Sequence, residues 1–366
     1  MNIYIFNIFL VLLIFILSPK RSKDKYTTNN VHGRYGRISI IIIFTTMFLE
    51  MGLRGDFYID TINYYNKFVD LGHESLKSVL QGNKDLGYDL ISHFFFRFIS
   101  QQYLYYLLFI SVVISACFSI FIYRESLMIW LSFFVLLCSG SFYSGFNIMK
   151  EIMVVSFFSL LYYYIYRRCF VKYVLITLFI SMIHTSALFM LPVYFLPLIR
   201  WKHVDYKWAI ALLILTLYLA GQIMGVVVEK LIGTFWVHFA REGAFGMDEG
   251  ISLQGTIKAV VLGMFVVLNL KKFNKNSSRE MLIYNGCIMY VFFAICGYKL
   301  YMIQRFVHYF TPCLMIGYPI VISRINDLNR RRIVLALTVI VLILSSINII
   351  LEPPYYFYWN NVVVKW

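Results

Sequence analysis

The chain has 366 residues, of which 60% are hydrophobic and 19% aromatic, while only 14% are charged. Soluble domains contain about 45–50% apolar and about 25% charged residues, so this composition excludes a soluble globular protein. The formal net charge of +15 comes from basic residues between apolar runs, a pattern of membrane topology and not of a nucleic-acid-binding surface, so no nucleic-acid partner is expected.

Apolar runs recur along the whole chain. They predict an all-α fold, a polytopic transmembrane helical bundle of about 11–12 spans, because about 20 apolar residues cross a bilayer as a helix. We expect one integral membrane domain, residues 1–366. The expected spans are 3–17, 38–53, 103–122, 127–146, 149–166, 208–228, 256–270, 281–298, 306–322 and 333–350, with the segment 173–199 among them. The first run lacks the basic start and cleavage site of a signal peptide, so we expect a retained helix with its N-terminus outside.

Basic residues gather in alternate loops, which marks those loops as cytoplasmic. The clusters are Lys20, Arg21, Lys23, Lys25, Arg34 and Arg37; Arg167, Arg168 and Lys172; Arg200, Lys202 and Lys207; Lys271, Lys272 and Lys275; and Arg330, Arg331 and Arg332. Segment 173–199 is therefore flanked by basic residues at both ends. It is too long for one span and short for two, and its polar break, His184-Thr185-Ser186, lies at the middle. This pattern predicts a helical hairpin with His184 at its tip.

Two longer loops, 54–102 and 229–255, are expected on the outer (periplasmic) side. Within the first, residues 86–102 are apolar at helical spacing and are expected to lie along the membrane interface. The six cysteines show no paired metal-ligand spacing, so no disulfide, metal site or cofactor is expected.

The stretch "LRGDFYIDTINYY" places charges and tyrosines where the second span ends. The guanidinium of Arg54 offers a fork of donors suited to phosphate oxygens. Asp56 and Asp60 lie one helical turn apart, so they are candidates to orient a sugar hydroxyl or to accept its proton. Tyr64 belongs to the same cluster. The alternative is an ordinary interfacial anchor at a helix end.

Lys150 and Glu151 open the fifth span, and charged residues within a span usually face a bundle interior or cavity. The alternative is a lysine that reaches to the interface and a glutamate favoured at a helix N-terminus. His184 is either a core histidine or a functional ionisable group, and no nucleophile-elbow glycines surround Ser186 to suggest a hydrolase.

The stretch "GYKLYMIQRFVHYFTP" is the fourth candidate. Lys299 and Arg305 fall in a short outer turn, and Arg305 shares a helix face with His308 and Tyr309. Interfacial snorkelling is the alternative. Arg54, Lys150, Lys299 and Arg305 would thus all end at one depth beside carboxylates and tyrosines, which favours a pocket for a lipid-linked diphosphate.

The chain resembles the EpsG/Wzy-type family of O-antigen and exopolysaccharide polymerases over about residues 40–358. The matching stretches, in order, are "LRGDFYIDTINYYNKF", "KDLGYDLISHFF", "NIMKE", "IHTSAL", "QRFVHYFTP" and "PPYYFYW". The chain has Lys150-Glu151 where the family tends to have Arg-Gln, so the charge is kept without the two-pronged fork. It also reads Arg54-Gly55-Asp56 in place of Gly-Arg-Asp.

The resemblance implies a glycosyltransferase of the bacterial inner (cytoplasmic) membrane, working at the periplasmic face in lipopolysaccharide or exopolysaccharide biosynthesis. It would join undecaprenyl-diphosphate-linked oligosaccharide repeat units. A chain-length regulator and a flippase are the implied partners, besides membrane lipid. The implied site has Asp56, Asp60 or His184 as catalytic base, and a substrate-binding set of Arg54, Tyr64, Lys150, Glu151, Gln304, Arg305 and Tyr309.

Two other function classes stay open. A flippase or other transporter would also bind a lipid diphosphate in the membrane, but should show internal repeats and charges in both leaflets, whereas the charges here lie mainly at one face. A ligase of the same pathway would be expected to carry one long periplasmic loop between late spans, whereas the longest loop here is early.

Overall fold

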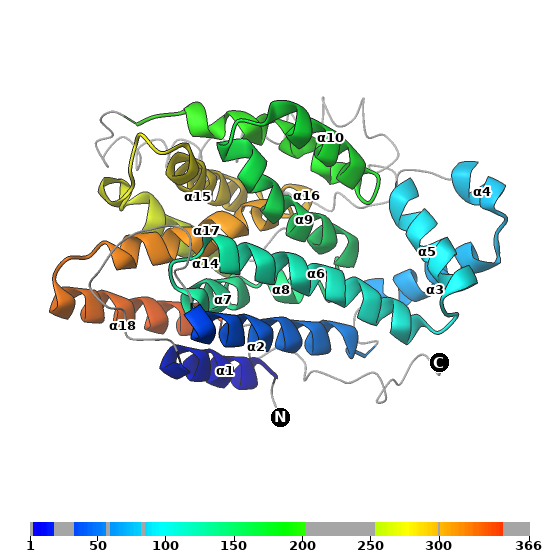
Figure 1. Ribbon diagram of the computed structural model, residues 1–366, viewed down its shortest axis with the longest axis horizontal. Helices are drawn as coiled ribbons and strands as arrows, with labels where there is room; N and C mark the ends of the chain where they lie inside the picture. Colours follow the sequence, from blue (N-terminus) through cyan, green and yellow to red (C-terminus); the bar gives the residue numbers. More distant parts are fainter. Residues whose placement is uncertain are drawn as a thin grey trace. The chain divides into compact units, whose positions relative to one another are not determined.

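The computed structural model describes residues 3–17, 33–55, 59–81, 85–201, 253–298 and 301–346. The chain divides into two compact units, each described here by itself. Unit 1 is Met1–Tyr194 with Ile333–Trp366, and unit 2 is Phe195–Arg332. All the long elements of the described part are helices, as the sequence predicted (Figure 1).

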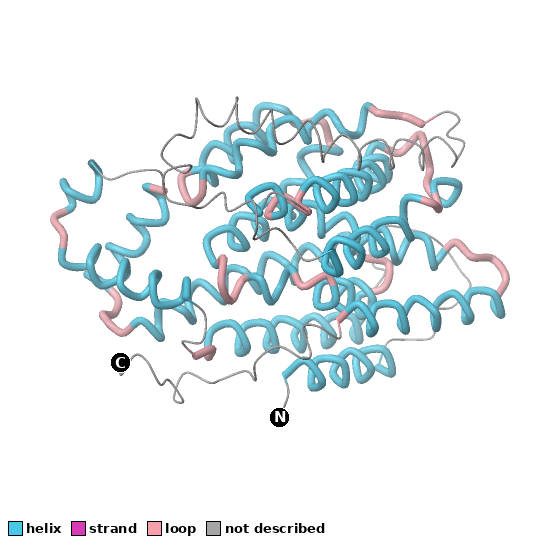
Figure 2. Tube along the Cα trace, turned by 180° about the vertical axis from the view of Figure 1, so that it is seen from behind, coloured by secondary structure: helices cyan, strands magenta, loops and turns pink. Residues whose placement is uncertain are grey.

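Unit 1 contains the helices of the N-terminal half of the chain. In chain order these are α1 (Ile3–Leu17), α2 (Gly33–Gly52), α3 (Ile59–His73), α4 (Leu76–Gln81), α5 (Leu86–Phe98), α6 (Tyr103–Glu125), α7 (Ile129–Cys138), α8 (Ser141–Ser144), α9 (Met149–Tyr166), α10 (Phe170–Ser181) and the 3₁₀ helix η1 (Thr185–Leu198). The boundary between the units falls within η1, so residues 195–198 belong to unit 2. Helix α2 packs along α6, α6 along α9, and α9 along α10, while α3 packs against α5. The tube in Figure 2 shows the same helices from behind.

Unit 2 contains α14 (Leu253–Val267), the short 3₁₀ turn η3 (Leu270–Lys272), α15 (Ser278–Cys296), α16 (Tyr301–Gln304) and α17 (Val307–Ser323). Its core is the packing of α15 against α14 and α17. Helix α18 (Leu328–Ser345) begins in unit 2 and ends in unit 1.

The apolar runs form helices long enough to cross a membrane. Among the described residues, Tyr35–Gly52, Tyr103–Glu125 and Ser278–Cys296 meet both length and composition requirements, and shorter apolar helices accompany them. Large apolar side chains such as Phe9, Ile41 and Phe179 point outward and are more than half exposed, which suits lipid and not water. The chain is therefore an all-α membrane bundle, as expected. The expected span 208–228 and most of the loop 229–255 lie outside the described residues.

One expected span is divided. Residues 127–146 were expected to form a single helix, but α7 ends at Cys138 and the short α8 follows after Gly140. Gly140 has a φ of 81°, the left-handed region that glycine adopts without steric penalty, and this residue interrupts the helix.

The predicted hairpin in 173–199 is confirmed. Helix α10 ends at Ser181, and η1 then returns along it, so that the ring of Tyr194 lies 5.0 Å from Phe170 and 5.6 Å from Tyr173. The returning arm is a 3₁₀ helix and contains Pro192, which has no N–H to donate to an α-helical ladder. His184 lies at the turn between the two arms, as predicted.

A buried polar link joins three helices of unit 1. The side-chain amide of Asn7 in α1 donates to the Glu50 carboxylate in α2 at 2.9 Å and to the Tyr143 hydroxyl in α8 at 2.8 Å. All three side chains are buried. Because unpaired polar groups are unfavourable in a membrane interior, these bonds fix the positions of α1 and α8 relative to α2.

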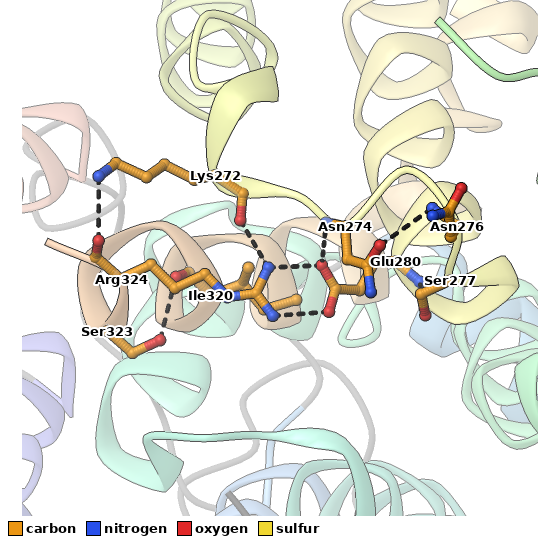
Figure 3. A network of polar contacts seen from close by, with 8 residues as sticks. All are labelled: Lys272, Asn274, Asn276, Ser277, Glu280, Ile320, Ser323 and Arg324. Carbon is orange, nitrogen blue, oxygen red and sulfur yellow. Dashed lines mark hydrogen bonds and ion pairs between the residues drawn. The ribbon is translucent and has the colours of Figure 1, made fainter. Parts of the chain in front are cut away.

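An ion-pair network joins the start of α15 to the residue after α17 (Figure 3). The guanidinium of Arg324, which follows α17, donates to both oxygens of Glu280 in the first turn of α15, each at 2.6 Å. The same Arg324 donates to the carbonyl of Lys272, and the Ser277 hydroxyl accepts from the Glu280 N–H as a helix cap. A two-pronged pair of this kind is among the stronger side-chain contacts, so it stabilises the turn between α14 and α15.

Candidate functional site

Asp85 joins three segments of unit 1 that are far apart in the sequence. Its Oδ2 accepts a hydrogen bond from Lys150 Nζ at 2.7 Å, and its Oδ1 lies 3.2 Å from His184 Nδ1. Asp85 precedes α5 in the expected outer loop, Lys150 lies in the first turn of α9, and His184 forms the hairpin tip. The site therefore combines two residues predicted from sequence with one that was not.

The backbone explains why the Asp85 carboxylate is available for this contact. Aspartate directly before a helix usually caps it by accepting from backbone N–H groups. At Asp85 the side chain makes no such bond, and its backbone carbonyl alone accepts from Asp89 N–H at 3.0 Å. Both carboxylate oxygens thus face Lys150 and His184.

The charges around Asp85 decide its protonation state. Burial by itself would raise the pKa of this carboxyl, but the hydrogen bond to His184 and the positive charge of Lys150 outweigh burial and lower the pKa below its usual value. An ionised carboxylate can only accept, so Nδ1 of His184 carries the proton in this pair. In a neutral imidazole, Nε2 is then left as the acceptor.

Two tyrosines flank the ammonium group of Lys150. Its Nζ lies 5.1 Å from the ring centroid of Tyr88 in α5 and 5.8 Å from that of Tyr64 in α3, distances at which a cation is attracted to an aromatic ring. The two rings are 6.1 Å apart. Tyr64 was predicted as a site residue, and the structure places it beside Lys150.

Arg54 contacts the residue that precedes Lys150 in α9. Its side chain is buried, and it donates to the Met51 carbonyl at 3.0 Å and to the Met149 sulfur at 3.1 Å, next to Lys150 in the chain. The guanidinium also lies 5.9 Å from the ring of Phe146. Glu151 is buried in the first turn of α9, and its neighbour Lys150 forms its ion pair with Asp85.

The two aspartates that were predicted as bases are placed differently. Asp60 stands in the first turn of α3, where negative charge is favoured by the helix dipole, and it is partly exposed. Asp56 lies outside the described residues. A role for either in proton transfer stays a prediction.

The remaining predicted residues belong to unit 2. Gln304 ends α16, Arg305 follows it, and Tyr309 is fully buried in α17 with its ring 6.2 Å from that of Phe306. Lys299 lies outside the described residues. The convergence of Arg54, Lys150 and Arg305 on one diphosphate stays a prediction, because the two units are each described alone.

Sequence reasoning missed Asp85 and Tyr88 as site residues. A signal was present in "KDLGYDLISHFF", where an acidic residue, a glycine and a tyrosine occur within four positions: Asp85, Gly87 and Tyr88. Among the residues that the structure describes, no three His, Cys, Asp or Glu side chains gather closely enough to hold a metal ion.

The fold and this cluster define a polytopic membrane protein with ionisable groups held together at the ends of its helices. The family model of the EpsG family matches residues 37–361, and the chain therefore belongs to the EpsG family. This membership supports a role of the polysaccharide-polymerase type. Comparisons with curated proteins and with solved structures gave no match.

Proposed function

We propose that this protein is a surface-polysaccharide polymerase, a glycosyltransferase that joins undecaprenyl-diphosphate-linked oligosaccharide repeat units. The observation that carries the proposal beyond family membership is the Asp85 carboxylate, which holds Lys150 on one oxygen and His184 on the other. A carboxylate bonded to one imidazole nitrogen is a common arrangement for orienting a histidine that acts as a general base.

The reaction needs a base at the acceptor and positive charge at the leaving group. In the proposed step, Nε2 of His184 takes the proton from an acceptor sugar hydroxyl, whose oxygen attacks the anomeric carbon of the donor. The bond between that carbon and the diphosphate oxygen breaks, so the lipid diphosphate leaves with the electron pair. Asp85 stabilises the imidazolium that forms, and the proton passes from it to solvent or to the departing phosphate.

His184 is favoured as the base over Asp60 and Asp56 by its surroundings. It is a quarter exposed, so a substrate hydroxyl has access to the ring, while Asp85 fixes the tautomer. Asp60 and Asp56 are the alternative candidates for the general base. Arg54, Lys150 and Arg305 are the proposed phosphate contacts, Glu151 and Gln304 are proposed to belong to the same substrate-binding set, and Tyr64 and Tyr309 are proposed to contact sugars.

The location follows from the predicted topology. Basic loops place the start of α10 on the cytoplasmic side, so the hairpin tip with His184 points to the outer side, where α9 begins and α5 lies. We therefore propose that the reaction occurs at the periplasmic face of the bacterial inner membrane. A chain-length regulator and a flippase of the pathway are the proposed partners.

A reconstituted assay tests the proposal. The full chain is placed in lipid nanodiscs with undecaprenyl-diphosphate-linked repeat units, and products are resolved as a ladder of repeats. We expect a ladder from the wild type and a much slower one from His184→Gln. Ser186→Ala, on the same hairpin tip, is the matched control and should form the ladder at the wild-type rate. The proposal would be wrong if the wild type formed no ladder. If the wild type also moved a fluorescent lipid-linked unit from one leaflet of a vesicle to the other, it would be a flippase instead.

A further inference from the structure

We infer that Gly87 is a positioning residue, which fixes the hairpin tip through a main-chain contact and so keeps His184 on Asp85. The backbone N–H of Gly87 donates to the carbonyl of Met182 at 2.7 Å. Gly87 lies two residues after Asp85, and Met182 lies two residues before His184. This hydrogen bond between Gly87 and Met182, called the lock below, is therefore a main-chain contact close in sequence to both members of the Asp85–His184 pair.

The lock joins two helix ends that need partners. Gly87 is in the first turn of α5, where backbone N–H groups have no acceptor within the helix, and Met182 caps the C-terminus of α10, where carbonyl groups have no donor. The positive end of one helix dipole thus meets the negative end of another, which favours the contact. No side chain is required for this bond, so sequence patterns of polar residues give no sign of it.

Only glycine fits at this position. A β-carbon on residue 87 would lie 2.8 Å from the Met182 Cβ, 2.9 Å from its carbonyl carbon and 2.9 Å from its carbonyl oxygen. Two of these three atoms are backbone, so they cannot rotate away as a flexible side chain can. Adding a methyl group therefore forces the hairpin tip and α5 apart.

Such a separation acts directly on the site. The His184 Nδ1 to Asp85 Oδ1 distance is 3.2 Å, already near the long end of the hydrogen-bond range. A displacement of about 1 Å would take the pair beyond hydrogen-bonding distance. The Lys150–Asp85 contact involves α9 and not the hairpin, so it should be retained.

Hydrogen exchange tests the lock without reference to activity. In the wild-type chain in nanodiscs, residue-resolved exchange should show the Gly87 amide protected. In Gly87→Ala, exchange of the hairpin-tip peptide 182–187 should rise several-fold. Gly72→Ala is the matched control. Its added β-carbon would crowd the Phe96 ring, between α3 and α5 and not between α5 and the hairpin. The tip peptide should exchange there as in the wild type.

Two results would overturn the inference: a Gly87 amide that exchanges as fast as an unstructured peptide, or equal tip exchange in the Gly87→Ala and wild-type chains. Exchange of the Gly87 amide is measured in the wild-type chain, so this test holds even if the Gly87→Ala variant does not fold. The effect of Gly87→Ala on catalysis rests on the proposed function and is measured separately. If the chain is a polymerase, Gly87→Ala should lower kcat with little change in KM. If the wild type makes no polymer, the proposed function fails while the exchange result still decides the lock.

Discussion

Asp85 and His184 are 99 positions apart in the chain, and a hydrogen bond of 3.2 Å joins them. The first belongs to the loop before α5 and the second to the tip of the α10–η1 hairpin. Lys150 holds the other oxygen of the same carboxylate at 2.7 Å. The proposed function depends on this three-way contact.

Replacing Asp85 by Asn should reduce the polymerisation rate by roughly 100-fold or more, because His184 loses the carboxylate that orients it and stabilises its charged form. The rate of ladder formation in nanodiscs measures this effect. Asp89→Asn is the control in the first turn of α5, four residues after Asp85: Asp89 is buried and forms its ion pair with Lys67 at 2.6 Å, so this variant should keep a polymerisation rate near that of the wild type. Equal activity of the two variants would contradict the role of Asp85.

The Asp85 contacts should make stability depend on pH. The pKa of Asp85 is lowered in the folded protein, so the unfolded chain binds more protons at this group. The contribution is fully present above about pH 3.9, the ordinary aspartate pKa, and is lost as pH falls toward the folded-state pKa. The Tm difference between wild type and Asp85→Asn should therefore be largest near neutrality and shrink below about pH 4. A Tm difference that does not vary with pH would count against an ionised Asp85.

Lys150→Arg should be tolerated, because arginine keeps the positive charge beside Asp85 and can also bind phosphate. Lys150→Gln should lower the free energy of unfolding by about 1–3 kcal/mol, since the Asp85 carboxylate loses its charged partner. Thermal unfolding in detergent and the polymer ladder measure the two effects. Complete inactivity of Lys150→Arg in a folded protein would show that the space between the Tyr64 and Tyr88 rings requires lysine itself.

Arg305→Ala should abolish polymer while the amount of protein in the membrane stays unchanged, since the residue is proposed to contact the donor diphosphate. Immunoblotting of membranes and gel analysis of surface polysaccharide measure the two quantities. Arg330→Ala, an exposed arginine in an expected cytoplasmic loop, is the matched control and should be without effect. Normal long-chain polysaccharide in Arg305→Ala would remove this residue from the site.

The fold was largely predictable because apolar length and basic loops constrain a membrane protein strongly. The hairpin followed from the basic residues at both ends of 173–199, and its tip at His184 followed from one polar break. The division of 127–146 at Gly140 was missed, because a glycine within an apolar run does not reveal its φ.

The site was predictable only in part. Lys150 and His184 were identifiable because ionisable groups are unfavourable in apolar segments. Asp85 lies in a polar loop, where a carboxylate needs no explanation, and its role appears only when three distant segments meet. Gly87 contributes a main-chain bond, which leaves no mark in the pattern of side chains.

A double-mutant cycle of polymerisation rates tests the central claim most directly. The rates of Asp85→Asn, His184→Gln and the double variant are compared with the wild type in the same nanodisc assay. When two residues act as one unit, replacing either of them removes their shared contribution to the rate. The double variant should therefore be about as slow as the slower single variant. Losses that multiply in the double variant would show that Asp85 and His184 act independently and would contradict the proposed pair.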